Sequence, residues 1–489
     1  MKEDWIEVIS SEILDIRDGT HDTPKYIQDE VHPLVTSKNL KQRVLDLTNV
    51  KYISEEDFIE INKRSKVDIG DVLFAMIGTI GNPVVIKKEP HYSIKNIGLF
   101  KNRFKVIDSN LLGYFLDSTT FYHQLQKKQF LKGTTQKFIP LGHLRKIELP
   151  LPPLVEQKAI INKIEELFSS LDSGITDLKK AKEQLAIYRQ AVLKKAFEGE
   201  LTKEWREKQA NLPTSEKLLK QIKEERQRLY EEQLNDWKKA VKIWKKNGEE
   251  GKKPKKPKKI IDYPEIEQSS TLPILNLGEL VFQISNKMMP NEAPEFPFIG
   301  MDCLEKNALK PHFTYKFKEF KSAGNWFNTN HVLYGRLRPY LNKVYQAEYE
   351  GVASGEFIIL ETIKSFSPNY LKLILHQQDF VHWANKQSAG DKPRVKYDQI
   401  ALYPIKVPTI KEQQQIVQEI ESRLSVCDKV EESIIESLEK AQALRQSILK
   451  KAFEGKLLTK DEIAKCKAQP EYEPAGALLE RIKKEKTKK

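Results

Sequence analysis

Apolar residues recur at every seventh position along two long stretches of the chain, while the sequence before each stretch has the pattern of short strands and turns. In the first stretch the recurring residues are Ile164, Leu171, Leu178, Leu185 and Val192, with Ile160, Leu167, Ile175 and Ala196 at intervening places. In the second stretch they are Ile420, Cys427, Ile434, Ala441 and Ile448. A seven-residue apolar repeat predicts a long helix whose narrow apolar stripe packs against another helix. We therefore expect two long helices that pair with each other.

The two stretches are copies of one sequence. Residues 152–201 align without a gap to residues 408–457 at a constant offset of 256. The run LKKAFEG occurs letter for letter in both copies, at 193–199 and at 449–455. Prolines precede each stretch and a glycine follows each, as helix boundaries prefer. The repeat predicts an antiparallel coiled coil with a pseudo-twofold organisation.

The segments before the two helices also correspond, more faintly. Residues 71–74 resemble 331–334 at an offset of 260, and after each helix residues 218–223 resemble 478–483. Short β-rich runs among Gly, Asn and Pro turns, with helical stretches at 111–128 and 368–385, predict an α+β fold. The expected order of parts is an α+β domain (1–150), a long helix (151–200), a helical tail and Lys-rich linker (201–262), a second α+β domain (263–406), a second long helix (407–457) and a basic helical tail (458–489).

Positive charge is concentrated in two segments of the 489-residue chain, whose formal net charge is +13. Residues 238–259 contain eleven lysines and two glutamates, and residues 481–489 contain six basic residues and one glutamate. The remaining chain is close to neutral, so the charge permits a nucleic-acid partner without establishing one, and lysine runs are usually solvated. Because proline blocks a helix and lysines repel one another, we expect 238–259 to be an extended linker.

The composition predicts a cytoplasmic protein with no place in a membrane. The mean hydropathy is −0.56, and no apolar run approaches the roughly 20 residues that span a bilayer. The first residues, MKEDWIEVIS, lack the apolar core of a signal peptide. Cys303, Cys427 and Cys466 lie far apart without a CxxC pair, which favours neither a disulfide framework nor a zinc site.

The duplicated architecture suggests two functions of different classes. Two related but unlike domains held apart by a helical pair match the pseudo-twofold symmetry of B-DNA, on which equivalent reading elements are placed at fixed helical spacing. Such a chain would recognise an asymmetric, split site. The alternative is a duplicated coiled-coil interaction scaffold that reads no bases.

Over essentially its whole length the sequence resembles the specificity (S) subunits of type I restriction-modification systems. The resemblance lies first in LPLPPLVEQKAIINKIEELF (149–168), in its partner VPTIKEQQQIVQEIE (407–421) and in the two LKKAFEG runs. The two domains add RDGTHDTPKY (17–26), TSKN (36–39), GDVLFAMIGTIGN (70–82) and VLYGRLRPYLNKV (332–344). The Lys-rich insertion between the halves departs from the family pattern.

The resemblance implies a non-catalytic protein with two target-recognition domains separated by two helices. Each domain would read one half of a bipartite site on double-stranded DNA. The helices would dock two methyltransferase (M) subunits, and restriction (R) subunits would complete a nuclease. S-adenosylmethionine, ATP and Mg²⁺ would then belong to the partner subunits, with no cofactor on this chain.

Candidate base-reading residues are those with side chains that hydrogen-bond base edges from loops on a rigid scaffold. In the first domain they are Thr20, His21, Lys38, Asn39, Gly133, Thr134, Thr135, Gln136 and Lys137; in the second they are Arg336, Arg338, Lys343, Lys392 and Arg394. The loops GTTQK and GDKPR could equally be ordinary surface turns. Arg336 and Arg338 could alternate on a strand and serve an internal ion pair, and His21 could bond Asp18 or Asp22.

Candidate docking residues are polar or aromatic positions that are identical in the two helix copies, because packing alone tolerates variation. They are Glu156, Gln157, Arg189, Gln190, Phe197, Glu412, Gln413, Arg445, Gln446 and Phe453. Mutating LKKAFEG in one copy should then leave a complex with a single M subunit.

The sequence gives little support to an enzyme. It contains no GxxxxGK[ST] phosphate loop, no NPP[FY]-type methyltransferase motif and no HxxxH or HExxH metal spacing. His376 and His382 are six residues apart and do not share a helix face. A nuclease-like pattern could be drawn through Glu361 and Lys364, but acidic residues near lysines are common in a chain with 31% charged residues.

Overall fold

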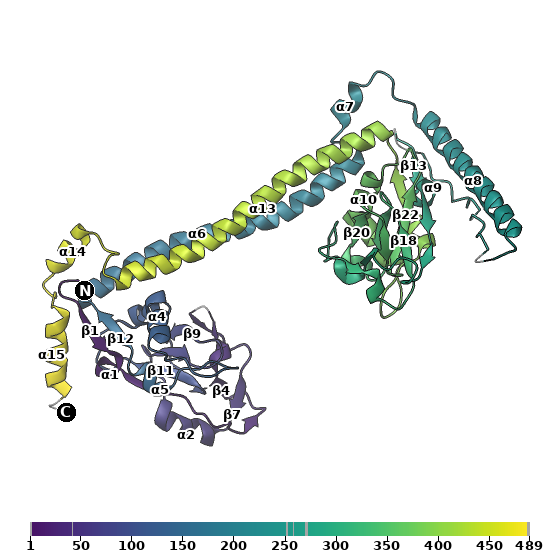
Figure 1. The fold of residues 1–489 in the computed structure, drawn as a ribbon. Coiled ribbons are helices and arrows are strands. Elements are labelled where there is room, and N and C mark those ends of the chain that lie inside the picture. Colours follow the sequence, from purple (N-terminus) through teal and green to yellow (C-terminus); the bar gives the residue numbers. More distant parts are fainter. Residues whose placement is uncertain (1, 42, 251–252, 258, 269–271, 487–489) are drawn as a thin grey trace. The chain divides into compact units, whose positions relative to one another are not determined.

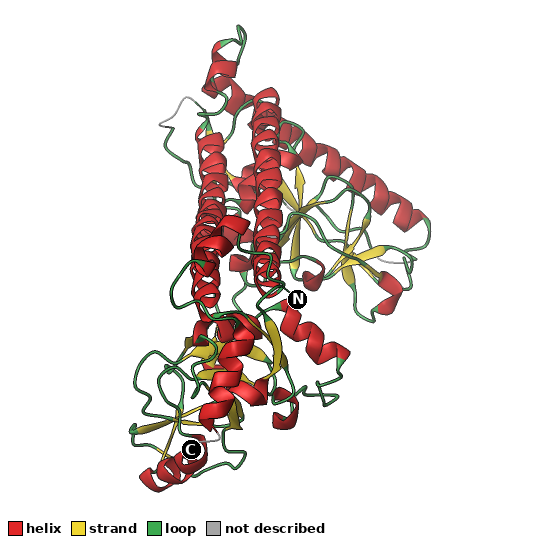
Figure 2. Cartoon of the chain, turned by 90° about the vertical axis from the view of Figure 1, so that its left-hand side faces the viewer, coloured by secondary structure: helices red, strands yellow, loops and turns green. Residues whose placement is uncertain are grey.

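The computed structural model describes residues 2–41, 43–250, 253–257, 259–268 and 272–486. The chain divides into two compact units: unit 1 comprises Met1–Lys180 and Ile434–Lys489, and unit 2 comprises Ala181–Ser433. Each unit contains one α+β domain, part of each long helix and one helical tail (Figure 1). Strands and helices are present in both units (Figure 2), which confirms the mixed fold class.

Both predicted long helices are present, as α6 (Leu154–Glu198) and α13 (Ile410–Phe453). In unit 1 the start of α6 packs against the end of α13, where Ile164 shares a core with Ile448. In unit 2 the end of α6 packs against the start of α13, where Ala196 shares a core with Ile420. Within each unit the helices therefore run antiparallel. The five seam residues predicted on α13 are all buried: Ile420, Cys427, Ile434, Ala441 and Ile448.

Domain 1, in unit 1, is built on a four-stranded antiparallel sheet in the order β2-β11-β8-β9, with a second four-stranded sheet in the order β10-β4-β7-β3. Two strand pairs, β1-β12 and β5-β6, complete it. Its elements are β1 (Ile6–Ile9), α1 (Ser10–Ile13), β2 (Asp15–Asp18), β3 (Tyr26–Ile27), β4 (His32–Val35), η1 (Ser37–Asn39), β5 (Leu40–Lys41), β6 (Val44–Leu45), β7 (Lys51–Ile53), α2 (Glu55–Ser65), β8 (Val72–Ala75), β9 (Gly81–Val85), β10 (Ser93–Ile94), β11 (Ile97–Lys101), α3 (Ser109–Leu116), α4 (Thr119–Lys127), α5 (Leu141–Leu144) and β12 (Glu148–Leu151).

Domain 2, in unit 2, repeats this plan with the sheet β14-β22-β19-β20, a five-stranded sheet β15-β18-β21-β16-β17 and the pair β13-β23. Its elements are β13 (Ile274–Asn276), α9 (Leu277–Leu280), β14 (Val281–Ile284), β15 (Lys287–Met288), β16 (Pro297–Ile299), η2 (Met301–Cys303), β17 (Tyr315–Lys316), η3 (Phe317–Glu319), β18 (Gly324–Phe327), β19 (Val332–Gly335), η4 (Pro339–Leu341), β20 (Val344–Gln346), β21 (Gly351–Ala353), β22 (Phe357–Thr362), α10 (Pro368–His376), α11 (Gln378–Gln387), α12 (Tyr397–Ile400) and β23 (Pro404–Lys406).

The two main sheets share their register. In domain 1 Leu73 lies opposite Leu99, and in domain 2 Leu333 lies opposite Ile359. Adding 260 to each number of the first pair gives the second, and the same holds along the whole ladder between β8 and β11. The faint sequence echo between the domains thus corresponds to one sheet built twice.

Each helical stretch predicted at 111–128 and 368–385 is two helices rather than one. In domain 1 the hydroxyl of Ser118 accepts a hydrogen bond from the amide of Phe121 and so begins a new helix, α4. In domain 2 Gln377 is extended between α10 and α11, with ψ at 152°. Serine favours a helix start over a helix interior, so Ser118 indicates the break in the sequence of domain 1. We find no comparable sequence signal at Gln377.

The tails after the two long helices pack on the domains in the same way. Leu218 and Ile222 of α8 (Ser215–Lys246) join the core of unit 2, and Leu478 and Ile482 of α15 (Ala475–Lys486) join the core of unit 1. Two shorter helices, α7 (Lys203–Glu207) and α14 (Lys460–Lys467), precede them. None of the helices in the described ranges has the length and apolar character needed to cross a bilayer.

The prediction of an extended linker over 238–259 is wrong for its first part. Residues 238–246 continue helix α8, which ends only at Lys246. Lysine is a good helix former, and the first proline of the segment is Pro254, so nothing in 238–246 opposes a helix.

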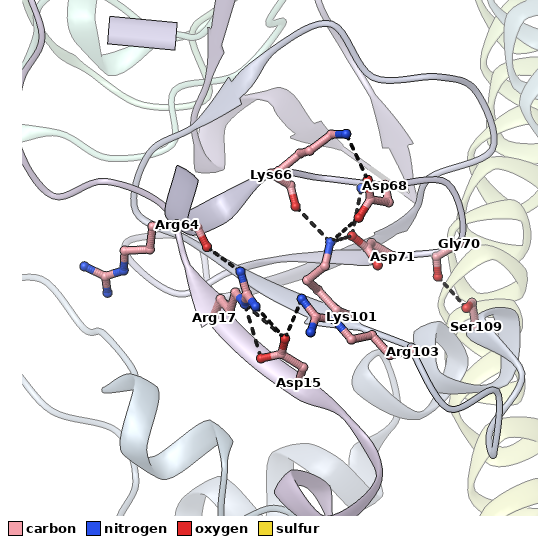
Figure 3. A network of polar contacts seen from close by, with 10 residues as sticks. All are labelled: Asp15, Arg17, Arg64, Lys66, Asp68, Gly70, Asp71, Lys101, Arg103 and Ser109. Atoms are coloured by element: carbon pink, nitrogen blue, oxygen red, sulfur yellow. Dashed lines mark hydrogen bonds and ion pairs between the residues drawn. The ribbon is translucent and has the colours of Figure 1, made fainter. Parts of the chain in front are cut away.

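A buried lysine anchors the sheet of domain 1 (Figure 3). The ammonium of Lys101, on β11, donates to Asp71 and Asp68 at 2.7 Å each and to the carbonyl of Lys66 at 2.8 Å. Burial raises the pKa of Asp71 above its usual value, whereas the hydrogen bond from Lys101 lowers the pKa of Asp68. These bonds join the segment after α2 to β8 and β11. In domain 2 the place of Lys101 is taken by Glu361, whose pKa is raised by burial.

Unit 2 should lose stability as the pH falls below neutrality. His331 takes the place of Asp71, and its Nδ1 accepts a hydrogen bond from the amide of Asn328 at 3.1 Å. Burial lowers the pKa of His331 below its usual 6.5. A group with a lowered pKa in the folded state stabilises the fold above its unfolded pKa and loses that contribution as the pH falls. We expect the urea midpoint of unit 2 to decrease from pH 7 to pH 5.

The matched variant for this prediction is His331→Asn, whose side-chain oxygen can accept the same bond without titrating. It should flatten the pH dependence of the unit 2 transition. An equally steep dependence in that variant would show that other groups cause it, among them His376, whose pKa is also lowered by burial.

Candidate DNA-reading fingers and docking helices

Domain 1 carries an exposed hairpin, here called finger 1, over residues 132–138. Lys132 and Phe138 exchange two backbone hydrogen bonds of 2.9 Å that close it. Gly133 has a φ of +87°, and a Cβ there would lie 2.2 Å from the backbone oxygen of Gln136, so only glycine fits. Four predicted reading residues are exposed on finger 1: Thr134, Thr135, Gln136 and Lys137.

Finger 1 is fixed to the main sheet through the turn between β8 and β9. The amide of Gly78 donates to the carbonyl of Lys137 at 3.1 Å, and the amide of Ile139 donates to the carbonyl of Met76 at 2.9 Å. Ile77 and Phe138 form an isolated β-bridge. Because backbone bonds hold it on two sides, finger 1 presents its polar side chains from a rigid base.

Domain 2 carries the equivalent hairpin, finger 2, over residues 389–394. Ala389 and Arg394 form a β-bridge that closes it. The amide of Arg338 donates to the carbonyl of Pro393 at 2.7 Å, and Leu337 forms a β-bridge with Arg394. The bridge between Leu337 and Arg394 in domain 2 matches the bridge between Ile77 and Phe138 in domain 1.

The side chains on these equivalent backbones differ in chemistry. Gly78 beside finger 1 corresponds to Arg338 beside finger 2, and both have a positive φ, +77° and +53°. For a residue other than glycine this conformation costs about 1–2 kcal/mol. Arg338 is exposed. An arginine kept in a strained conformation with its guanidinium directed to solvent is a candidate for function.

The remaining candidates of domain 1 lie outside finger 1, in the loop after β2 and in η1. Both ring nitrogens of His21 are occupied within the domain: Nε2 contacts a carboxylate oxygen of Asp18 at 2.8 Å, and Nδ1 contacts the amide oxygen of Asn96 at 2.8 Å. This is the alternative that the sequence left open for His21. Thr20 accepts a hydrogen bond from the amide of Asp22 at 3.2 Å.

Lys38 and Asn39 have opposite environments. Lys38 is exposed, whereas Asn39 is buried with its amide group in four hydrogen bonds. Its oxygen accepts from the amide and the hydroxyl of Thr36, and its nitrogen donates to two backbone carbonyls. Asn39 therefore shapes the loop and has no hydrogen-bonding capacity left for a base in this conformation, which corrects its assignment as a reading residue.

In domain 2 some of the predicted reading residues have exposed side chains, and others are bonded within the domain. Lys392 is exposed on finger 2. Lys343 donates to the carbonyl of Met301 at 2.7 Å, and burial lowers its pKa. Arg394 forms a two-pronged ion pair with Glu356 at 2.9–3.2 Å. The side chain of Arg394 thus ties finger 2 to Glu356, whereas the side chain of Lys343 is bonded outside the finger, to Met301.

Arg336 and Arg338 are not on a strand, because β19 ends at Gly335. Within the part of the chain that the structure describes, neither guanidinium forms an ion pair, and Nε of Arg336 is buried without a hydrogen-bond partner. Two exposed neighbours of the fingers, Thr79 and Tyr340, were not among the residues expected to read bases. Tyr340 has 47% of its surface exposed. The offset of 260 already placed both in equivalent turns.

Comparison with known proteins agrees with this duplicated plan. A family model described as "Type I restriction modification DNA specificity domain" matches residues 2–185 and 275–440, which is most of the chain. The chain belongs to the type I restriction-modification specificity family. Specificity subunits are non-catalytic components, so the chain is not an enzyme, and the nuclease-like pattern at Glu361 and Lys364 has no catalytic meaning.

Two curated relatives and two solved structures illustrate the likeness. The chain is 27% identical over 73% of its length to the Escherichia coli EcoDI specificity subunit, covering 72% of it. It is 24% identical over 94% of its length to the EcoKI specificity subunit of strain K12, covering 90% of it. A chain solved in work on complex assembly and conformational transition of the type I R-M system shares the fold with a TM-score of 0.60, at 15% identity, 93% coverage of this chain and 98% of that one. The HsdS subunit from Thermoanaerobacter tengcongensis gives a TM-score of 0.50 at the same identity and coverages.

In this specificity chain, the polar residues that are identical in both helix copies lie mostly inside the units. Glu156, at 0% exposure, accepts hydrogen bonds from Lys2 at 2.7 Å and Trp5 at 2.8 Å. Its counterpart Glu412, at 1%, accepts from Thr202 at 2.9 Å and from Arg206 at 2.6 Å. Each glutamate ties the start of a long helix to a neighbouring segment of its unit.

The two glutamines beside these glutamates attach each helix to its domain. Gln157 accepts from the amide of Asp108, the residue that caps α3, at 2.7 Å. Gln413 accepts from the amide of Ser367, which caps α10, at 2.7 Å. Both glutamine side chains are fully buried. These four identical residues are therefore anchors, which corrects their assignment to a docking surface: an intramolecular bond explains their identity.

The six other predicted docking residues differ in their contacts and in their exposure. Arg189 pairs with Asp428 at 2.7 Å and Glu431 at 3.1 Å, and Arg445 pairs with Asp172 and stacks on Phe168. Phe197 contacts the ring of Tyr370, Phe453 contacts the ring of Phe115, Gln446 bonds the backbone of residues 117 and 119, and Gln190 is exposed.

Several exposed side chains on the long helices are apolar and differ between the two copies, so identity between the copies does not reveal them. In unit 2 they are Ile187, Tyr188, Val426 and Val430, with 43–70% of their surfaces exposed. In unit 1 they are Ile435 and Leu444, with 42% and 50% exposed. Tyr188 and Leu444 occupy equivalent places at the offset of 256. Exposed apolar side chains on the solvent side of a coiled coil are typical of an interaction surface.

Proposed function

We propose that each recognition domain of this chain reads one half of an asymmetric, bipartite site on duplex DNA. The observation that carries the proposal is the duplicated finger, one backbone arrangement built twice with different side chains. Domain 1 presents Thr134, Thr135, Gln136 and Lys137 on finger 1, and domain 2 presents Lys392 on finger 2 with Arg338 beside it. Glutamine suits adenine and arginine suits guanine in the major groove. Two readers of different chemistry require two different half-sites.

The long helices support a role in spacing. Each of α6 and α13 contributes residues to both units, and continuous helices resist changes of length. We propose that they fix the gap between the half-sites. S-adenosylmethionine, ATP and Mg²⁺ are then assigned to the partner subunits.

The experiment that tests this function maps adenine methylation in a host expressing the chain with its M subunit. The expected result is one motif with two unlike halves and a constant gap. Replacing Thr134, Thr135, Gln136 and Lys137 by alanine should relax only one half. Methylation without a split motif, or binding of partners without protection of DNA, would favour the interaction scaffold.

We propose further that the exposed apolar residues at Tyr188 and Leu444 dock two M subunits, one on each unit. Placing a charge at the centre of such a contact should cost roughly 2 kcal/mol of binding. Tyr188→Lys should therefore leave a complex with one M subunit in native mass spectrometry, as should Leu444→Lys, and the double variant should bind none.

The control for docking is Glu183→Ala, a change at an exposed position of the same helix outside the repeated LKKAFEG run. It should keep both M subunits. Two bound M subunits in the double variant would contradict the assignment of Tyr188 and Leu444.

A further inference from the structure

Helix α8 of unit 2 continues well beyond the domain on which it is seated. Its first half is held there: Ile222 is buried, and Glu225 accepts hydrogen bonds from the amides of Lys364 at 2.7 Å and Ser365 at 3.2 Å. Its second half extends to Lys246 (Figure 1). We call residues 230–250, 253–257 and 259–260 the basic arm.

The basic arm is an organised element with its own packing. Tyr230, Leu234, Trp237, Val241 and Trp244 are half-buried and recur at intervals of three or four residues, so they share one face of α8. Beyond the helix, Pro254, Pro257 and Ile260 are also half-buried, at every third residue of a segment without regular secondary structure. A three-residue period is that of the polyproline II conformation.

Specific contacts join this returning segment to the helix. The indole nitrogen of Trp237 donates to the carbonyl of Pro254 at 3.0 Å. The ammonium groups of Lys256 and Lys253 each lie 5.8 Å from a ring centre, over Trp237 and Trp244 respectively. The prolines and the tryptophan face therefore meet, and the lysines between the prolines remain outside.

The result is a dense array of exposed lysines. Those on the helix and on the returning segment are Lys238, Lys239, Lys242, Lys245, Lys246, Lys253, Lys255, Lys256 and Lys259. Among these nine, only Lys239 is in an ion pair, with Asp236 at 3.3 Å. These like charges repel one another, and a polyanion bound along the array would relieve the repulsion.

We propose that the basic arm binds the phosphate backbone of duplex DNA beside the half-site read by domain 2. The inference rests on the proposed DNA reading. Duplex DNA fits the array better than an acidic peptide because it carries one charge per about 1.7 Å of its axis. Lysine acts as a point charge without the planar fork that reads bases, so the arm contributes affinity without sequence preference.

The test uses the complex with M subunits and measures binding to a cognate duplex by fluorescence anisotropy at several salt concentrations. One variant changes Lys242, Lys245, Lys246, Lys255 and Lys256 to Gln. The matched control changes the same five residues to Arg, which keeps the charge. Each phosphate contact contributes about 0.9 to the slope of log K against log salt. The Gln variant should reduce the magnitude of the slope by up to about 4.5, while the Arg variant should retain it.

Three further measurements test whether duplex DNA is the occupant. Affinity for a non-cognate duplex should fall by the same factor as affinity for the cognate one. A duplex that ends flush with the second half-site should bind wild type and the Gln variant equally, because the arm then has no backbone to contact. Trp237→Ala with Trp244→Ala, which releases the returning segment without changing the charge, should give an intermediate slope.

The outcomes separate this inference from the proposed function. Loss of the split footprint in the wild-type complex would overturn the function itself. A normal split footprint with an unchanged slope in the Gln variant would overturn only the basic arm. Binding of the arm to vesicles with 30% phosphatidylserine, combined with an unchanged DNA slope, would assign it to a membrane surface and likewise overturn the proposal.

Discussion

Changing Arg338 to glycine should weaken specific DNA binding through the second half-site while leaving the fold of domain 2 intact. Arg338 has a φ of +53°, a conformation that glycine adopts without strain. Domain 1 shows that the backbone tolerates the change, because Gly78 occupies the equivalent place with a φ of +77°. A bidentate contact from arginine to guanine is worth about 1–3 kcal/mol. We therefore expect a loss of roughly 5- to 150-fold in affinity for the cognate site.

The measurement compares binding to the cognate duplex with binding to duplexes substituted at each position of the two half-sites. In Arg338→Gly, discrimination should disappear at one position of the second half-site and remain intact in the first. Arg338→Lys retains the charge and should recover affinity without restoring discrimination. Uniform weakening at every position would instead identify Arg338 as a phosphate contact.

Replacing Glu412 with alanine should destabilise unit 2 by about 3–5 kcal/mol. The carboxylate is 1% exposed and accepts two hydrogen bonds from Arg206 and one from Thr202. Removing one partner of a buried ion pair leaves the other charge uncompensated, and this is the origin of the cost. Urea unfolding, followed by limited proteolysis to assign the transition, would measure it.

This variant also distinguishes an anchor from a docking residue. The matched change in unit 1 is Glu156→Ala, which removes the partner of Lys2 and Trp5. Each variant should destabilise its own unit. A variant that unfolds like the wild type but binds fewer M subunits would restore the docking role that the sequence suggested.

The long helices and the duplication could be predicted because a heptad pattern and an exact repeat are local properties of the sequence. The burial of Ile164 and Ile420 follows directly from such a pattern. The anchors could not be assigned in the same way. Glu156 and Gln157 are identical to Glu412 and Gln413, but identity alone does not say whether a partner lies in the same chain or in another.

The sequence predicted that the fingers are loops. Whether each of their side chains is free or bonded within the domain depends on contacts with residues distant in the sequence. Arg394 and Lys392 are two residues apart, but Glu356 binds only the first. Asn39 has a side chain that could bond a base, but its amide nitrogen donates to the backbone carbonyls of Asp46 and Asn49. The apolar residues Tyr188 and Leu444 escaped notice because they differ between the copies.

The composition of the two units also sets an order of events during synthesis. Unit 2 is one continuous stretch of chain, Ala181–Ser433. All of it is therefore outside the ribosome once enough further residues have been made to fill the exit tunnel. Unit 1 draws Ile448, Leu478 and Ile482 into the core of the domain that was made first. Until the final residues emerge, that early domain has an uncovered apolar surface, of the kind that chaperones bind and that promotes aggregation. The half of the protein that is translated first is thus the half that is finished last.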